Sequence, residues 1–331
     1  MSEPNATSVN HTQPTVTVFF AADETYAPYL SVAITSLLAN SNPLRRYHII
    51  VLERGMSHEH QHQLAGLSQP NATVEMCHIS DKINDLVNSD NNMLVADYKT
   101  TTLYFRLFIP ELFPDIDRAI YLDTDTVITD DVAQLFDTDL QGNLMGAVHD
   151  QTMDVQEALI RYCQAEHGFD TRGYINSGVL LMDCERLREI NFVQQFTELL
   201  NTYHPELAAV DQDYINAMLH DSLLLLDPRF NVLSANGPDD VADPCIIHFN
   251  LFNKPWNYPD ALRADIWWKY AAQSPNYEEL LLRLQNFPPI NRELDELKKG
   301  RLMNQAWAIV DHADPTFASL IKAGVQVRVK M

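Results

Sequence analysis

Two sequence patterns alternate along the first part of the chain. Short runs rich in β-forming residues are separated by segments with helical hydrophobic spacing, the first of which places Leu30, Ala33, Ile34 and Leu37 on one face. The strands are predicted at residues 15–20, 47–52 and 73–79, and a second helix at 57–67. Ser57 is the predicted N-cap of that second helix. This β-α-β-α-β order predicts a parallel sheet with helices on both faces.

The remaining chain continues the alternation and then becomes helical. Further strands are predicted at 118–122, 144–148, 178–182, 223–226 and 245–249, and further helices at 100–108, 184–203 and 211–220. From residue 258 onward the strand patterns fade. We therefore expect an α/β fold with a mostly parallel central sheet, in three parts. They are a disordered N-terminus at 1–14, a catalytic domain at 15–257 and a small C-terminal helical subdomain at 258–331.

Composition narrows the class of protein. The 331 residues are 46% hydrophobic, which is enough for a sizeable core, and no run is long and apolar enough for a signal peptide or a membrane span. The four cysteines lie far apart without a C-x-x-C pair, which is typical of free thiols in a reducing compartment. We expect a cytoplasmic protein.

The net charge restricts the ligands. A formal charge of -22 excludes nucleic acid as a partner, because phosphate binding needs a basic surface. The same field would repel any phosphorylated ligand. A bound divalent cation would remove this repulsion locally.

Two aspartates directly follow the apolar strand predicted at 118–122. Residues two apart on an extended chain point to the same side, so Asp123 and Asp125, with Thr124 between them, direct both carboxylates toward one point. Other Asp-x-Asp triplets begin at 115, 137 and 211, and the first two lie in turn-like sequence. Adjacent carboxylates at the end of a buried strand repel each other unless a cation joins them, so the triplet at 123 predicts a metal site.

The same aspartates also fit a second signature. The string from Tyr121 to Val127 resembles the aspartyl-phosphate motif of haloacid-dehalogenase-type phosphatases, in which the first aspartate, here Asp123, is the nucleophile. That motif normally ends the first strand of its sheet, whereas several predicted strands precede Asp123. A phosphohydrolase that uses Asp123 is the alternative function.

A histidine and a lysine follow the last predicted strand. His248 is a suitable third ligand beside two carboxylates, and an imidazole suits Mn²⁺ better than Mg²⁺. Lys254 lies six residues further on and could contact phosphates as a point charge.

The chain resembles the family 8 retaining glycosyltransferases, which include bacterial lipopolysaccharide galactosyl- and glucosyltransferases and the glycogenins. The resemblance covers residues 16–256 and rests on the order and spacing of several motifs. These are Ala21-Ala22-Asp23 with Tyr26, Tyr104-Phe105-Arg106-Leu107, Tyr121-Leu122-Asp123-Thr124-Asp125, Asn176-Ser177-Gly178-Val179, Asp211-Gln212-Asp213, and His248 with Lys254-Pro255-Trp256. It implies a GT-A-type nucleotide-sugar-binding fold. It also implies Mn²⁺-dependent transfer of galactose or glucose from a UDP-sugar to a saccharide or glycolipid acceptor.

The resemblance also assigns roles to residues. The metal, Mn²⁺ with Mg²⁺ as the alternative, would be held by Asp123, Asp125 and His248. The donor nucleotide would be contacted by Ala21, Asp23, Tyr26, Thr124 and Lys254. The donor sugar would be surrounded by Arg106, Asn176, Asp211 and Gln212, and Asp150 matches a position that touches sugar.

Retention of configuration needs either two inversions or attack from the face of the leaving group. By the resemblance, Gln212 stands at the position of a nucleophile, but an amide is a poor nucleophile, so we expect same-face attack. Asp211, Gln212 and Lys254 are the catalytic candidates, and Asp213 is the remaining carboxylate candidate. Leu251 replaces the glycine that usually lies near the diphosphate in this family, so a non-catalytic sugar-nucleotide binder is a third hypothesis.

Residues 292–331 have a balance of charge unlike the rest of the chain. They hold seven Lys or Arg against five Asp or Glu, a net charge of +2, mixed with apolar residues. Such a segment can lie on an anionic membrane, or its helices can pack on the catalytic domain. Both alternatives are open in the sequence, and the first would place the enzyme at the inner face of the membrane.

Overall fold

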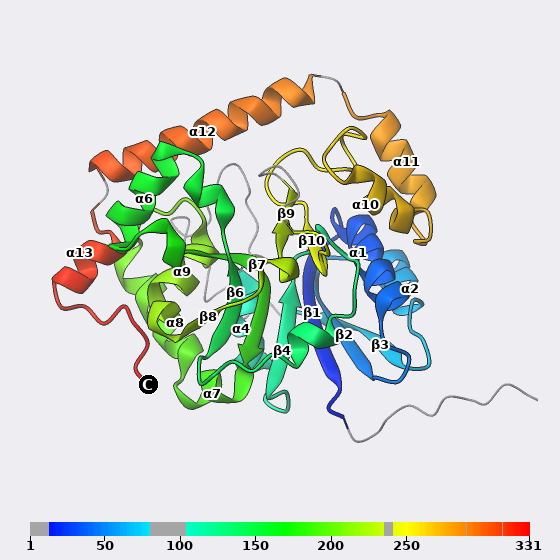
Figure 1. Cartoon of the computed structure of the whole chain (residues 1–331), viewed down its shortest axis with the longest axis horizontal. Coiled ribbons are helices and arrows are strands. Elements are labelled where there is room, and N and C mark those ends of the chain that lie inside the picture. The colour runs from blue at the N-terminus through cyan, green and yellow to red at the C-terminus, as the bar shows by residue number, and fades with distance from the viewer. Residues whose placement is uncertain (1–12, 80–103, 235–240, 289, 313) are drawn as a thin grey trace, which may run out of the picture.

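The computed structural model describes residues 13–79, 104–234, 241–288, 290–312 and 314–331. Their main element is a seven-stranded sheet in the order β3-β2-β1-β4-β7-β6-β8 (Figure 1). Its strands are β1 (Val16–Asp23), β2 (Tyr47–Arg54), β3 (Ala72–His78), β4 (Arg118–Leu122), β6 (Met145–His149), β7 (Ile175–Asp183) and β8 (Leu223–Leu225). Residues 1–12, most of the segment predicted to be disordered, lie outside the described part of the chain.

The sheet is mostly parallel, as predicted. The pairs β1–β2, β2–β3, β1–β4 and β6–β8 are parallel, whereas β7 runs antiparallel to both of its neighbours, β4 and β6. The reversal brings the first residues of β7 to the edge where β1 and β4 end. Asp123 N, just after β4, donates a hydrogen bond to Gly178 O at 2.8 Å.

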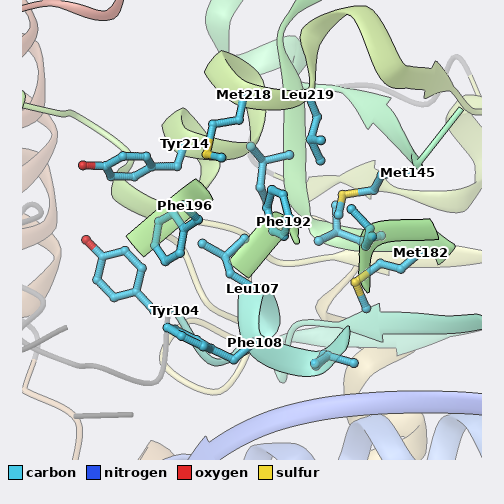
Figure 2. Packing of buried hydrophobic residues seen from close by; sticks show 14 of the residues in the cluster. Tyr104, Leu107, Phe108, Met145, Met182, Phe192, Phe196, Tyr214, Met218 and Leu219 are labelled. Carbon is cyan, nitrogen blue, oxygen red and sulfur yellow. The ribbon is translucent and has the colours of Figure 1, made fainter. Parts of the chain in front are cut away.

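Alternation along β1 divides the core between the two faces of the sheet. Val16, Val18 and Phe20 pack with α1 (Ala27–Asn40), and Phe19 belongs to the cluster on the opposite face. On the α1 side, α2 (His58–Ala65) begins after the predicted N-cap, and Ser57 Oγ accepts from His60 N at 3.3 Å. The opposite face is covered by aromatic residues of three helices (Figure 2). These helices are α4 (Phe105–Leu112), α8 (Phe192–Tyr203) and α9 (Val210–Leu219).

A second, three-stranded sheet has the order β5-β10-β9. β5 (Thr126–Ile128) follows the acidic triplet, and β10 (Ile246–His248) pairs with it antiparallel, His248 opposite Thr126. β9 (Val232–Leu233) lies on the other side of β10. This pairing brings the end of β10 beside Asp125, whose O accepts a hydrogen bond from Phe249 N at 2.8 Å.

Several local elements differ from the sequence prediction. The helix predicted at 184–203 is two helices, α7 (Cys184–Glu189) and α8, because Asn191 between them adopts a left-handed φ of 54°. The helix predicted at 100–108 is α4, and residues 100–103 lie outside the described part. The prediction missed the short β5 and β9, as well as α5 (Ala133–Phe136) and α6 (Glu157–His167).

The C-terminal part is helical, as predicted, but its helices share the cores of the rest of the chain. α10 (Ala264–Ala271) and α11 (Tyr277–Gln285) pack on α1, while α12 (Asn291–His312) and α13 (Phe317–Lys322) pack on α6 (Figure 1). Phe317, Leu320 and Val327 belong to the large cluster on the face of the sheet opposite α1. Among the described residues, no helix has the length and apolar character needed to cross a membrane.

Candidate active site

The predicted metal ligands meet where β4 and β10 end. Asp123, Asp125 and His248 each offer one ligand atom, and these atoms lie within 4.8 Å of one another. His248 Nε2 lies 3.2 Å from Asp125 Oδ1 and 3.8 Å from Asp123 Oδ2. Two carboxylates and one imidazole form a donor set that suits Mn²⁺ and related divalent cations.

Two neighbours shape this trio. A Cβ added at Gly178 would lie 2.2 Å from His248 Cε1 and 2.8 Å from Asp123 Oδ2, so only glycine leaves room for both ligands. His248 Nδ1 lies 3.1 Å from Asn231 Oδ1. With the proton on Nδ1, this contact orients the ring and leaves Nε2 as the ligand nitrogen. The residues present therefore fit a divalent cation. The sequence analysis missed Asn231, which precedes a two-residue strand and belongs to no recognised motif.

Lys254 contacts the same site. Its Nζ lies 2.5 Å from Asp125 Oδ2 and also donates to the carbonyl oxygen of Phe249. Burial raises the pKa of Asp125, but the positive charge of Lys254 and the contact with His248 outweigh it and hold that pKa well below its usual range. Asp125 is therefore an anion paired with a buried ammonium group.

Arg106 connects the metal trio to α9. It is 3% exposed, and its guanidinium lies 2.9 Å from Asp123 Oδ1 and 3.1 Å from Asp211 Oδ2. It also donates to Ser177 O at 2.7 Å. Burial raises the pKa of Asp211 to about 6, although the positive charge of Arg106 acts against that rise.

Three further polar side chains form a network beside Asp211. Asp150 Oδ2 accepts from Asn176 Nδ2 at 3.1 Å and from Gln212 Nε2 at 3.0 Å. The carbonyl oxygen of the Gln212 side chain accepts from Ser177 N at 3.0 Å. Both ends of the Gln212 amide are therefore fixed, and its orientation is set by β7 on one side and Asp150 on the other.

One cavity of about 300 Å³ joins these groups. Its lining includes all the sequence-predicted site residues except Asp213, which are Ala21, Asp23, Tyr26, Arg106, Asp123, Thr124, Asp125, Asp150, Asn176, Asp211, Gln212, His248 and Lys254. The carboxyl ends of β1 and β4 open into it, as expected for an α/β sheet.

The structure argues against the catalytic role expected for Asp213. This side chain is fully buried and does not line the cavity. Its oxygens accept hydrogen bonds from Tyr162 at 2.7 Å and Tyr174 at 2.5 Å, and from Ala209 N at 2.7 Å; His167 Nε2 lies 2.9 Å away. Residues two apart on a helix lie about 200° apart around its axis, so Asp213 points away from Asp211. Its position assigns it a structural role within α9.

The loop after β10 carries unusual backbone conformations. Leu251 and Asn253 have φ values of 55° and 57°, in the left-handed region that disfavours a leucine. Leu251 lines the cavity and is 40% exposed. The leucine that departs from the family pattern thus stands at a position where the backbone itself favours glycine.

Comparison with known proteins gives consistent matches. A model described as Glycosyl transferase family 8 matches residues 17–260. The chain is 28% identical over 265 residues to the glycosyltransferase GlyF of Streptococcus pneumoniae, covering 76% of this chain and 60% of that protein. It is 25% identical over 262 residues to the lipopolysaccharide 1,2-glucosyltransferase of Escherichia coli, covering 75% and 74% of the two chains. A solved structure of the galactosyltransferase LgtC with donor and acceptor sugar analogs matches with a TM-score of 0.64 at 26% identity, covering 78% of this chain and 96% of that chain.

Proposed function

Because the chain belongs to glycosyl transferase family 8, we propose that it is a retaining hexosyltransferase that uses a UDP-sugar. The hexose would be galactose or glucose, and the acceptor a saccharide or glycolipid. The names of two similar proteins, a lipopolysaccharide glucosyltransferase and a galactosyltransferase, support this substrate class. Family membership does not support the phosphohydrolase alternative.

One observation carries the proposal. The three residues of metal-ligand type, Asp123, Asp125 and His248, line the same cavity as the Asp150–Gln212 network. Gly178 leaves room for two of them, Asp123 and His248. A divalent cation bound by Asp123, Asp125 and His248 would stabilise negative charge on a diphosphate leaving group. The imidazole ligand favours Mn²⁺ over Mg²⁺, which prefers oxygen ligands alone.

The donor nucleotide would lie along the ends of β1 and β4. Ala21, Asp23 and Tyr26 line this part of the cavity and would contact the uridine. Lys254 would exchange its contact with Asp125 for the phosphate oxygens, because a dianionic diphosphate offers an ammonium group more charge than one carboxylate.

The chemistry proposed is same-face substitution. The bond between the anomeric carbon and the diphosphate oxygen breaks, and the acceptor hydroxyl attacks from the same face. Its proton passes to the departing phosphate oxygen. The fixed Gln212 amide would support the sugar on the opposite face, with Asp150, Asn176 and Asp211 holding its hydroxyl groups. The enclosed position of Asp213 supports this route over a covalent intermediate on that carboxylate.

We propose the cytoplasm as the place of reaction. All four cysteines are free thiols, as is usual in a reducing compartment. Leu302, Ile309 and Phe317 of the C-terminal segment are buried, which supports packing on the catalytic domain over the membrane alternative. Pelleting of the full chain with anionic but not with neutral vesicles would instead favour membrane contact.

Two aspartate variants test the proposed function. Asp125→Asn should remove the Mn²⁺-dependent rise in thermal midpoint that UDP gives the parent, because a ligand that binds only the folded state stabilises it. Asp115→Asn is the matched control, since it alters an exposed Asp-x-Asp triplet outside the cavity. Equal responses of both variants would refute the metal site.

Turnover distinguishes an enzyme from a binder. Labelled UDP-galactose and UDP-glucose, each with Mn²⁺, should yield an α-linked product with a suitable acceptor. A β-linked product would refute retention. UDP binding without transfer or donor hydrolysis would identify a non-catalytic sugar-nucleotide binder.

A further inference from the structure

The cavity has an apolar side that the proposed donor contacts do not use. It is formed by Met153 of the 3₁₀ turn Gln151–Asp154, Leu159 of α6, Ala208 before α9 and Leu302 of α12. We call these four side chains the aliphatic wall. They belong to one buried cluster, and all of them also line the cavity.

The wall adjoins the polar network around Gln212. Met153 N donates a hydrogen bond to the backbone oxygen of Asp150 at 3.1 Å. The side-chain carboxylate of the same Asp150 accepts from the Gln212 amide. Ala208 lies in the segment that leads into Asp211 and Gln212. If Asp150 and Gln212 hold the donor sugar, an acceptor that approaches it from the side of Met153 and Ala208 must therefore pass along the aliphatic wall.

The tyrosine hydroxyl in the same cluster already has hydrogen-bond partners. Tyr162 also lines the cavity, but its hydroxyl donates to Asp213 at 2.7 Å and accepts from Ala208 N at 3.0 Å. The wall therefore offers dispersion contacts and removal from water rather than hydrogen bonds. Such a surface selects hydrocarbon, not hydroxyl groups.

Helix α12 completes the aliphatic wall and is fixed in place. α12 crosses the molecule from α11 to α6 and packs along α6 (Figure 1). Gln305 Nε2 of α12 donates to Leu207 O at 3.0 Å, next to Ala208. This contact fixes Leu302 relative to the segment before α9.

We propose that the aliphatic wall is an acceptor subsite for a hydrocarbon group attached to the acceptor sugar. The inference rests on the proposed function, which it deepens by naming the class of acceptor. It makes α12 part of the substrate site.

The experiment measures binding of alkyl glycosides to the full chain. Methyl, ethyl, butyl and hexyl β-glucosides and β-galactosides are titrated calorimetrically into protein saturated with Mn²⁺ and UDP. Affinity should rise with chain length, by at most about fourfold per methylene, until the wall is covered. It should then stop rising, unlike non-specific partition. Equal affinities for methyl and butyl glycosides, or no binding of the series, would overturn the inference.

Two variants on one helix test the position of the subsite. Leu302→Ala should weaken the dependence of affinity on alkyl chain length, so that hexyl glycosides lose more affinity than methyl glycosides. Ile309→Ala is the control, because Ile309 lies in the same buried cluster but does not line the cavity. Equal effects of the two variants would refute the subsite. Failure of UDP to bind with Mn²⁺ would instead refute the proposed function.

Discussion

Lys254 and Asp125 form an ion pair in the candidate metal site, with Nζ 2.5 Å from Oδ2. The ammonium group therefore competes with any cation that Asp125 would bind. Diphosphate would attract the lysine away from the carboxylate, so nucleotide and metal should bind as a coupled pair. A coupling of this kind is reciprocal, since each ligand strengthens the other by the same factor.

Lys254→Met tests this competition. Without UDP, the variant should bind Mn²⁺ more tightly than the parent, because Asp125 is released; with couplings of ~1–3 kcal/mol, we expect about tenfold. Its affinity for UDP should fall. Electron paramagnetic resonance of free Mn²⁺, recorded with and without UDP, measures both effects. An unchanged Mn²⁺ affinity in the absence of UDP would show that the ion pair does not oppose the metal.

Gly178→Ala should damage the metal site. Its Cβ would lie 2.2 Å from the His248 ring, and such overpacking costs about 1–3 kcal/mol of stability. Mn²⁺ affinity should fall, because the ring must move. Gly300→Ala is the control: its Cβ meets nothing within 4 Å on α12, and alanine should add ~1 kcal/mol of helix stability. Denaturant unfolding measures the stability of the two variants, and Mn²⁺ titration measures their metal affinity. Parental Mn²⁺ affinity in Gly178→Ala would contradict the assignment.

Leu251→Gly should improve use of the donor. Relief of left-handed strain, ~1–2 kcal/mol, is offset in part by the greater freedom of glycine in the unfolded chain, so stability should change little. The donor KM should fall by about tenfold, or ~1.4 kcal/mol, because the backbone can then approach the diphosphate. Gln141→Gly also relieves a positive φ but lies outside the cavity, so its KM should match the parent. Steady-state kinetics measure the donor KM of both variants and the parent. A raised KM in Leu251→Gly would show that the leucine contacts the donor productively.

Glu166 predicts a pH dependence of stability. Burial, with a smaller contribution from Asp213, raises the pKa of Glu166 to about 8, and its Oε2 has no hydrogen-bond partner among the described residues. The folded state then holds a proton that the unfolded state has released. Its stability should therefore decrease as pH rises from the ordinary glutamate value toward 8, by an amount on the order of 4 kcal/mol.

The matching variant is Glu166→Gln, which cannot ionise. Urea unfolding at pH 5 and pH 9 should show a smaller loss of stability for this variant than for the parent. Glu157→Gln changes an exposed carboxylate on the same helix and should keep the parental difference. Equal pH dependence in Glu166→Gln and the parent would exclude Glu166 as the source.

The sequence predicted those features that depend on local spacing. The run of β-forming residues at 15–20 predicted a strand, which is observed as β1, and Asp123 and Asp125 face one point because the chain there is extended. Asp211 and Asp213 are also two residues apart, but they lie on a helix, where this spacing points the two side chains in different directions. Applying helical geometry to that triplet would have excluded Asp213.

Features that depend on contacts distant in sequence could not be predicted from spacing. The antiparallel direction of β7 and the pairing of β5 with β10 involve chain directions that hydrophobic patterns do not encode. Asn231 acquires its role only because β9 lies beside β10. Leu302 likewise becomes a cavity residue through the packing of α12 on α6.

The pairing of β5 with β10 has a consequence for the architecture of the chain. Asp123 and Asp125 stand at the beginning of a long chain segment, and His248 stands at its end. A cation bound by all three would therefore act as a reversible cross-link between the two ends. Closing a long loop removes conformational freedom from the chain, and a bond between its ends favours the closed form. The Lys254–Asp125 ion pair makes a similar closure with a side chain. The two ends of the segment between residues 125 and 248, which includes Asp150, Asn176 and Gln212, are thus held together.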